Sequence, residues 1–354
     1  MHVPEPSSPC DLNSIPGVHI LVLKLGALGD VIRTSYILPG LHERFGPGTA
    51  VTWVTAPAAL PLLRFNPYIA DLVSSDRCSG DTLPAELTSV EFDWVLSFDD
   101  EAESCGMAQR VRARKISGAY LSEGTVHYSE DTNAWFDMGL ISRFGKARAD
   151  QMKIVNQKSH DEVFAGMLGI KIARPIFFNN PMSEQRALTL PKLPPPRRVG
   201  LNLSAGKRWP SKSLRLEEAI QLIEQLRQME ANCVLLGGIA DEEYLEALSA
   251  QTGAPSISRL SLDCFAGVVR ELDLLITSDT LALHLAIAQG VPSVSYYAPT
   301  SAAEINTFGT GGKIVSTSPD YCSYRPDADN STITASRVSA EAARLLEVPR
   351  DGQR

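Results

Sequence analysis

The stretch Ile20–Phe45, ILVLKLGALGDVIRTSYILPGLHERF, contains the pattern that decides the fold. Its first four residues, Ile20–Leu23, are an unbroken apolar run, which is typical of a parallel strand buried on both faces. Gly26 and Gly29 predict a tight turn, and a helix is expected to begin at Asp30. The pattern therefore predicts a strand, a glycine turn and a helix, with one carboxylate at the carboxyl end of the strand. In open α/β sheets, ligands bind at that end.

Asp30 has two interpretations at this stage. Aspartate is a favoured N-cap residue and stabilises the helix dipole, so the side chain could serve the helix alone. It could equally be a functional carboxylate, although a G-x-x-G turn is less specific than a full dinucleotide fingerprint. A second, similar pattern in the other half of the chain favours the functional interpretation.

Length and composition indicate a soluble protein of two domains. The chain has 354 residues, of which 44% are hydrophobic and 21% charged, and no apolar run is long enough to span a membrane. Residues 1–17 are rich in Pro and Ser and predict a loose tail without the features of a signal peptide. The six cysteines form no C-x-x-C pair, which indicates neither a zinc site nor a disulfide framework and fits free thiols in the cytoplasm.

The charge of the chain bears on its partners. A formal net charge of −8 argues against nucleic acid. One basic segment, residues 143–158, carries five Lys or Arg residues and a single acidic one, Asp150. Such a segment is either a solvated helix face or a surface that meets an anionic acceptor or a lipid headgroup layer.

Strands and helices alternate in both halves of the chain, which predicts a parallel sheet in each. Further strands are expected at 50–55, 69–73, 92–98, 199–203, 233–236, 272–277 and 291–297, and residues 132–170 are expected to be helical. The segment Pro191–Arg198, PKLPPPRR, predicts a stiff linker, because its prolines fit neither a helix nor a central strand. The expected parts are a tail (1–17), an N-terminal domain (18–190), the linker (191–198), a C-terminal domain (199–335), and a C-terminal helix and tail (336–354).

Two motifs of the C-terminal half could bind phosphate. The loop Ser204–Pro210, SAGKRWP, can present backbone N–H groups and the cations Lys207 and Arg208, although Lys207 could also be an ordinary exposed lysine. The motif Ser278–His284, SDTLALH, puts Asp279, Thr280 and His284 at a helix N-terminus, where orphan backbone donors favour a diphosphate. The structural alternative makes Asp279 an N-cap and His284 a hydrogen-bonded core residue.

Together these groups suggest a transfer reaction at a cleft between the two domains. Asp30 would take the proton from an acceptor hydroxyl as that hydroxyl attacks an activated sugar carbon. Lys207 and the helix terminus at Thr280 would stabilise the departing diphosphate without a metal. Asp99 and Asp100 lie at a predicted strand end but lack the spacer of a D-x-D metal motif.

The chain resembles the ADP-heptose:lipopolysaccharide heptosyltransferases (glycosyltransferase family 9) over nearly its whole length. The resemblance is carried by GALGDVIRT (Gly26–Thr34), KRWP (Lys207–Pro210), LLGGIADEE (Leu235–Glu243) and SDTLALHLAIAQGVPSVSYYAPT (Ser278–Thr300). It implies a GT-B fold, two Rossmann-like domains facing across a central cleft, with the acceptor site in the first and the donor site in the second. It also implies inverting transfer, and a C-terminal helix near 339–346 that packs towards the first domain.

The resemblance assigns roles by position. Asp30 matches the general base, Lys207 the donor phosphates, Asp241 the nucleotide ribose, and Asp279 with Thr280 the donor diphosphate and sugar. The candidate donor-binding residues are Ser204, Lys207, Arg208, Gly238, Asp241, Asp279, Thr280, Leu281 and His284, and the acceptor-side loop comprises Gly26, Ala27 and Gly29. Two residues depart from the family pattern, since Leu281 replaces the glycine of D-T-G and Ala27 replaces a hydroxyl residue three before the base.

The expected function is a cytoplasmic, metal-independent inverting glycosyltransferase that needs no cofactor and reaches the inner face of the cytoplasmic membrane at most peripherally. It would move a heptose from ADP-heptose to a sugar hydroxyl of a lipopolysaccharide core precursor. Two alternatives stay open: a related transferase with a protein or small-molecule acceptor, and a non-catalytic module that binds a nucleotide sugar.

Overall fold

The computed structural model describes residues 17–78, 82–139, 143–180 and 197–347. The chain forms two compact units. The first unit comprises the residues up to 149 together with 161–173, and the second comprises 150–160 together with the residues from 174 onward. Each contains a largely parallel sheet with helices, so the predicted pair of Rossmann-like α/β units is confirmed.

The sheet of the first unit has the strand order β3-β2-β1-β4-β5-β6, in which only β6 runs antiparallel. Its strands are β1 (His19–Leu23), β2 (Ala50–Thr55), β3 (Asp71–Ser74), β4 (Trp94–Ser97), β5 (Ile116–Ser122) and β6 (Thr125–Tyr128). Helices up to residue 168 are α1 (Leu28–Thr34), α2 (Ile37–Phe45), α3 (Leu60–Leu63), α4 (Ala85–Thr88), α5 (Ala102–Arg110), α6 (Asn133–Phe136), α7 (Lys146–Val155) and α8 (His160–Leu168). Alternate residues of β1 face different layers: Leu21 and Leu23 pack with α5, as the two-sided burial of a parallel strand requires.

The helix expected to begin at Asp30 differs from the prediction in two ways. It begins at Leu28, with Ala27 in the N-cap position, so Asp30 lies inside the first turn. It also ends at Thr34, and a separate helix, α2, starts at Ile37. The interruption has a local cause, because Pro39 has no N–H to donate to the carbonyl of Ser35 four residues earlier.

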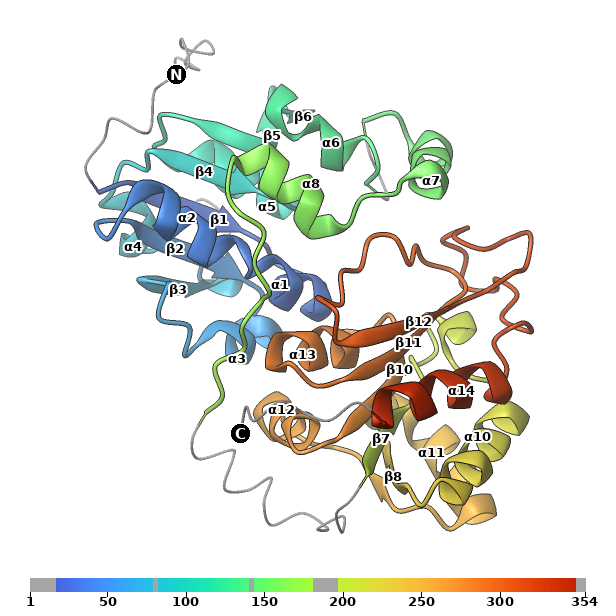
Figure 1. Ribbon diagram of the computed structural model, residues 1–354. Coiled ribbons are helices and arrows are strands. Elements are labelled where there is room, and N and C mark those ends of the chain that lie inside the picture. Colours follow the sequence, from blue (N-terminus) through green and yellow to red (C-terminus); the bar gives the residue numbers. More distant parts are fainter. Residues whose placement is uncertain (1–16, 79–81, 140–142, 181–196, 348–354) are drawn as a thin grey trace. The chain divides into compact units, whose positions relative to one another are not determined.

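The sheet of the second unit has the order β12-β11-β10-β7-β8-β9, and all its pairs are parallel. Its strands are β7 (Arg198–Asn202), β8 (Asn232–Leu236), β9 (Ser256–Ile257), β10 (Leu274–Ser278), β11 (Ser293–Tyr297) and β12 (Gly311–Val315). Its helices are α10 (Leu216–Gln228), α11 (Glu242–Thr252), α12 (Leu262–Arg270), α13 (Leu281–Gln289) and α14 (Ala335–Leu346). Figure 1 shows these helices on the two faces of the sheet, where α10, α11 and α14 cover one core and α12 and α13 the other.

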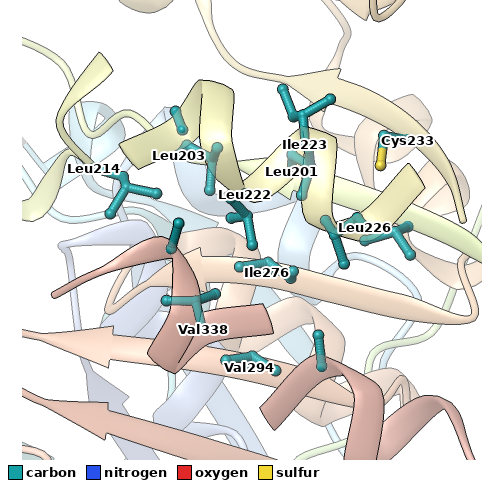
Figure 2. Close-up of a cluster of buried hydrophobic side chains, with 14 of the residues drawn as sticks. Leu201, Leu203, Leu214, Leu222, Ile223, Leu226, Cys233, Ile276, Val294 and Val338 are labelled. Carbon is teal, nitrogen blue, oxygen red and sulfur yellow. The ribbon is translucent and has the colours of Figure 1, made fainter. Parts of the chain in front are cut away.

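The C-terminal helix α14 packs on the sheet of the second unit. Val338 and Ala342 are fully buried in the core that α10 and the sheet of the second unit form. Figure 2 shows Val338 beside Ile276 of β10 and Val294 of β11. The helix therefore packs on the sheet of its own unit, and the expectation that it packs towards the first domain stays a prediction.

The strand order changes side at an equivalent point in both sheets. In the first unit, β2 lies on one side of the first strand, β1, and β4 lies on the other. In the second unit, β8 and β10 flank the first strand, β7, in the same way. The carboxyl ends of the two strands that flank such a switch point leave a space where ligands bind in doubly wound folds. The pairs β1/β4 and β7/β10 therefore mark where a site is expected in each unit.

A short segment from the middle of the chain, residues 150–160, belongs to the second unit. Its Lys153 is buried, with the ammonium 3.7 Å from the centre of the Tyr324 ring. The Tyr324 hydroxyl donates to Glu304 Oε1 at 2.9 Å, and the backbone N–H of His160 donates to the carbonyl of Glu304 at 2.9 Å. The segment is thus held by a buried cation–π contact and by hydrogen bonds.

Several predictions concern residues outside the described ranges. All but the last residue of the expected tail and all but the last two residues of the proline-rich linker fall there. Among the described residues, five cysteines are free thiols, as predicted, and no helix is long and apolar enough to cross a membrane.

Candidate functional site

Asp30 lies at the carboxyl end of β1, in the first turn of α1. Its carboxylate Oδ1 accepts a hydrogen bond from Arg33 Nη2 at 2.7 Å, and 38% of its side chain is exposed. The N-cap position belongs to Ala27, so the interpretation of Asp30 as the cap is wrong. The carboxylate is therefore oriented by a cation one turn away while it keeps access to solvent.

A buried ion pair lies beneath the loop that leads to Asp30. Lys24, directly after β1, donates to Asp99 Oδ1 and to the carbonyl of Gly26, and Asp99 Oδ2 accepts from the backbone N–H of Leu25. Both side chains are at most 10% exposed. Burial raises the pKa of Asp99 above its ordinary value, and the nearby Lys24 ammonium opposes that rise. Since Asp99 follows β4, the pair joins the two strands of the switch point and fixes the start of the loop that leads to Asp30.

The predicted acceptor-side residues follow this pair directly. Gly26 and Ala27 form the loop, and Gly29 lies in the first turn of α1. The structure therefore keeps Gly26, Ala27, Gly29 and Asp30 together at one sheet edge. Lys24 was missed by the motif analysis, although a lysine directly after an apolar strand and two residues before a glycine was a signal that could have found it.

The switch point of the second unit contains a hydrogen-bonded polar network. Asn202, at the end of β7, accepts from Thr277 Oγ1 at 3.0 Å and from Thr280 Oγ1 at 3.2 Å. Its amide nitrogen donates to the carbonyl of Leu236 at the end of β8 at 3.0 Å. Thr280 is the N-cap residue of α13, and Leu281, the first residue of that helix, is half-buried. Asn202, which no motif indicated, therefore fixes the Thr280 side chain at the start of α13.

Asp279 precedes the N-cap and is flanked by two basic side chains. Lys212 Nζ lies 3.2 Å from Asp279 Oδ2 and donates to the Asp279 carbonyl at 2.7 Å. His284 Nε2 lies 3.4 Å from Asp279 Oδ1 and is buried. The alternative that made Asp279 the N-cap is wrong, because Thr280 holds the cap. His284 is buried, as the interpretation of a hydrogen-bonded core histidine predicts, and its Nε2 faces the Asp279 carboxylate.

The loop after β7 places three of its basic residues differently. Lys207 and Arg208 are exposed near its tip, whereas Lys212, at the end of the short 3₁₀ helix Pro210–Lys212, is only 14% exposed. Ser204 is buried and its Oγ accepts from Ser213 Oγ at 3.5 Å. Sequence reasoning identified Lys207 and missed Lys212, whose partner is 67 positions away in the chain.

Asp241 connects two loops. Its Oδ1 accepts from the backbone N–H of Gly206 at 2.9 Å, and its Oδ2 accepts from the backbone N–H of Gly238 at 2.8 Å. Gly206 has a φ of +66°, a conformation that glycine adopts at little cost. The carboxylate thus holds the loop after β7 against the loop after β8.

The candidate donor-binding residues therefore gather at the carboxyl ends of β7, β8 and β10 in the second unit. This edge offers the N-terminus of α13, a lysine that neutralises a carboxylate, and two exposed cations on the adjacent loop. Such an arrangement suits a nucleoside diphosphate, whose charge is stabilised by backbone N–H groups, the helix dipole and lysine. Within the described ranges, no group of three or more His, Cys, Asp or Glu residues is placed to hold a metal.

Comparison with known proteins finds one family model that matches much of the second unit. Residues 185–331 match the model of glycosyltransferase family 9 (heptosyltransferase). A search of curated proteins by sequence finds no match.

Solved structures similar to this chain include the glycosyltransferase family 9 protein of Veillonella parvula DSM 2008, with a TM-score of 0.73 and 19% identity over 94% of this chain and 98% of that one. E. coli ADP-heptose lps heptosyltransferase II is similar with a TM-score of 0.64 and 18% identity, over 93% and 98% of the two chains. E. coli heptosyltransferase WaaC with ADP-2-deoxy-2-fluoro heptose is similar with a TM-score of 0.60 and 16% identity, over 92% of this chain and 99% of that one. These similarities establish the fold, which is the predicted GT-B architecture of two Rossmann-like units.

Proposed function

Because residues 185–331 match glycosyltransferase family 9, we propose that the chain is an inverting glycosyltransferase that moves a heptose from ADP-heptose to a sugar hydroxyl of a lipopolysaccharide core precursor. The observation that carries this proposal is the polar edge of the second unit, where α13, Asp279 and Lys212 converge at the switch point. The proposed donor nucleotide and sugar are supported by the similar WaaC structure, which was solved with ADP-2-deoxy-2-fluoro heptose.

In the proposed reaction, Asp30 accepts the proton of the acceptor hydroxyl. The oxygen of that hydroxyl forms a bond to the anomeric carbon of the heptose on the face opposite the nucleotide, and the bond from that carbon to the diphosphate oxygen breaks. The electron pair leaves with ADP, whose developing charge is stabilised by Lys207 and by the backbone N–H groups at the start of α13. Protein groups would supply this stabilisation, which is the basis for proposing that no metal is needed.

Ligand-induced stabilisation is the experiment that tests the donor. We expect ADP and ADP-heptose to raise the melting temperature of the purified chain, while UDP and GDP leave it unchanged. At about 100 times its dissociation constant, a ligand adds roughly 2.7 kcal/mol to stability, which corresponds to a shift of a few degrees. EDTA is expected not to reduce the shift, since the proposed site uses protein cations.

Each other outcome has a definite meaning. A preference for UDP or GDP would contradict the proposed donor, and loss of the ADP shift in EDTA would contradict metal independence. ADP-heptose binding without transfer to any sugar, protein or small-molecule acceptor would favour a non-catalytic nucleotide-sugar-binding module. Transfer to a protein or small molecule alone would favour the related transferase.

We further propose that the chain works in the cytoplasm and contacts the membrane surface peripherally through α7 and its flanks. Three large apolar side chains are exposed here, Phe144 (54%), Ile154 (56%) and Val155 (73%). Lys146, Arg148 and Lys158 are exposed in the same segment. Exposed apolar groups among cations are suited to an anionic lipid surface, and a glycolipid acceptor would be found there.

A vesicle sedimentation experiment tests this contact. The wild type is expected to bind vesicles that contain phosphatidylglycerol, to bind phosphatidylcholine vesicles more weakly, and to be released by salt. Ile154→Ser with Val155→Ser should weaken binding by about tenfold or more, because each loses part of the roughly 1.5–3 kcal/mol gained by burying a large apolar side chain. Ile239→Ser, which alters another side chain that is 69% exposed, is the matched control and should bind as wild type. Equal binding by both variants would refute the assignment to α7.

A further inference from the structure

Asp279 lies where its charge matters for any anionic ligand of the second unit. It directly precedes Thr280, the N-cap residue of α13, and its side chain is 16% exposed. A diphosphate at the start of α13 would lie beside this carboxylate. Two like charges a few ångströms apart repel each other strongly when water is partly excluded, so an uncompensated Asp279 would oppose the binding of such a ligand.

Of the two basic side chains that flank Asp279, Lys212 at 3.2 Å and His284 at 3.4 Å, Lys212 is the closer and provides the compensation. Its ammonium donates to the Asp279 carbonyl at 2.7 Å, lies 3.2 Å from Oδ2, and lies 5.5 Å from the centre of the Trp209 ring. These contacts hold the ammonium of a 14% exposed side chain beside Asp279. Lys207, five residues earlier on the same loop, is exposed instead. The two lysines are therefore placed for different tasks.

The loop that carries Lys212 is anchored on its far side. The backbone N–H of Ser211 donates to the carbonyl of Pro326 at 3.1 Å, and the side chain of Asn330 donates to the carbonyls of Ser211 and Ser213 at 3.2 and 2.8 Å. Because both neighbours of Lys212 are held, its backbone has little freedom. The position of the ammonium is thus determined before any ligand binds.

We propose that Lys212 is a positioning residue that neutralises and orients Asp279, and so allows a nucleoside diphosphate to bind next to a carboxylate. The inference rests on the proposed function, in that it assumes a diphosphate donor at the start of α13. It adds that Lys207 contacts the ligand, whereas Lys212 acts on the ligand through Asp279. In this arrangement the Asp279 carboxylate is held in place beside the donor without repelling its phosphates.

A double-mutant cycle measured by ADP titration calorimetry tests this inference. Lys212→Met should weaken ADP binding by about 10- to 100-fold, the range for a lost charged interaction. Asp279→Asn alone should change ADP affinity by less than about threefold, because ADP lacks the heptose of the proposed donor. The double variant, Lys212→Met with Asp279→Asn, should recover most of the lost affinity, since the uncompensated charge has been removed.

Companion variants separate this indirect role from direct contact and from a folding role. Lys207→Met should also weaken ADP binding, and Asp279→Asn should not rescue it. Lys212→Arg keeps the charge and should bind ADP nearly as wild type. Arg344→Met removes a cation from an exposed ion pair with Glu341; it is the matched control and should leave ADP affinity unchanged. Adenosine carries no phosphate, so its affinity should be the same in wild type and Lys212→Met.

The contrary outcomes are distinct. A double variant as weak as Lys212→Met would mean that Lys212 contacts the diphosphate directly, and equal losses for ADP and adenosine would mean that it only supports the fold; either result overturns the inference. Normal ADP affinity in Lys212→Met overturns it while the proposed function stands. A wild type that binds no nucleoside diphosphate overturns the proposed function, and the inference with it.

Discussion

Asp30→Asn is expected to lower kcat by about 10²- to 10⁴-fold, the usual contribution of a general base. The substitution keeps the size of the side chain and its hydrogen-bonding oxygen towards Arg33, which lies 2.7 Å away in the wild type, but removes the group that accepts the proton. ADP affinity should be unchanged, because the candidate donor-binding residues belong to the second unit. The measurement is the rate of ADP release from ADP-heptose in the presence of a deacylated lipopolysaccharide core precursor, together with ADP titration.

The control for Asp30 is Asp76→Asn, which neutralises an exposed carboxylate elsewhere in the first unit and should keep full turnover. If Asp30→Asn retains more than about a tenth of the wild-type rate, Asp30 is not the base. A parallel loss of ADP affinity would place Asp30 in donor binding. Only a loss in kcat with normal ADP binding agrees with the proposed role.

Lys24→Met should lower the free energy of unfolding of the first unit by about 3–5 kcal/mol, the usual cost of leaving one partner of a buried ion pair uncompensated. Asp99 would keep its hydrogen bond from Leu25 but lose its cation in a buried environment. Urea unfolding followed by tryptophan fluorescence measures this effect, since three of the four tryptophans, at positions 53, 94 and 135, belong to this unit.

The pH dependence of this loss identifies its cause. Burial raises the pKa of Asp99, so the fold favours the protonated carboxyl, and the stability that this gives is present at low pH and lost as pH rises through the folded-state pKa. Removing Lys24 removes the opposing influence and raises that pKa further. The deficit of Lys24→Met should therefore be largest near neutral pH and shrink as the pH falls towards the ordinary carboxyl range.

Two further variants complete this test. Lys24→Met with Asp99→Leu should be more stable than Lys24→Met alone, because the uncompensated charge is gone. Lys171→Met, which removes a lysine from an exposed pair with Glu43, should cost little. A deficit that does not change with pH would show that lost packing, and not the charge of Asp99, causes the destabilisation.

The parts of the fold that the sequence predicts are those with a strong local pattern. β2 was predicted with its observed bounds, and β1, β7 and β10 within one or two residues, because each is a short apolar run followed by a turn or helix signal. The edge hairpin β5–β6 and the strand β12 were missed. In ISGAYLS and GGKIV, the apolar residues are interrupted by glycine and polar residues. Such segments resemble loops until neighbouring strands supply hydrogen bonds.

The candidate site shows the same limit in its side chains. Residue types at strand ends and helix starts identified Asp30, Asp279 and Thr280, because those positions follow from the local pattern. Partnerships did not follow, because Lys212 and Asp279 are separated by 67 positions, and Asn202 and Thr277 by 75. Only the order of the strands in the sheet brings such residues together, and no local pattern determines that order.

The buried contact between Lys153 and Tyr324 affects how the chain could be divided. A fragment that starts after the proline-rich segment would contain all the strands of the second sheet, yet it would lack residues 150–160. Tyr324 would lose the cation that covers its ring, and the Glu304 carbonyl would lose the N–H of His160. The second unit is therefore discontinuous in sequence, so it is complete only when a peptide from the amino-terminal half of the chain has been added to it. During synthesis residues 150–160 leave the ribosome before Glu304 and Tyr324, so their contacts with these residues can form only after the later part of the chain has been made.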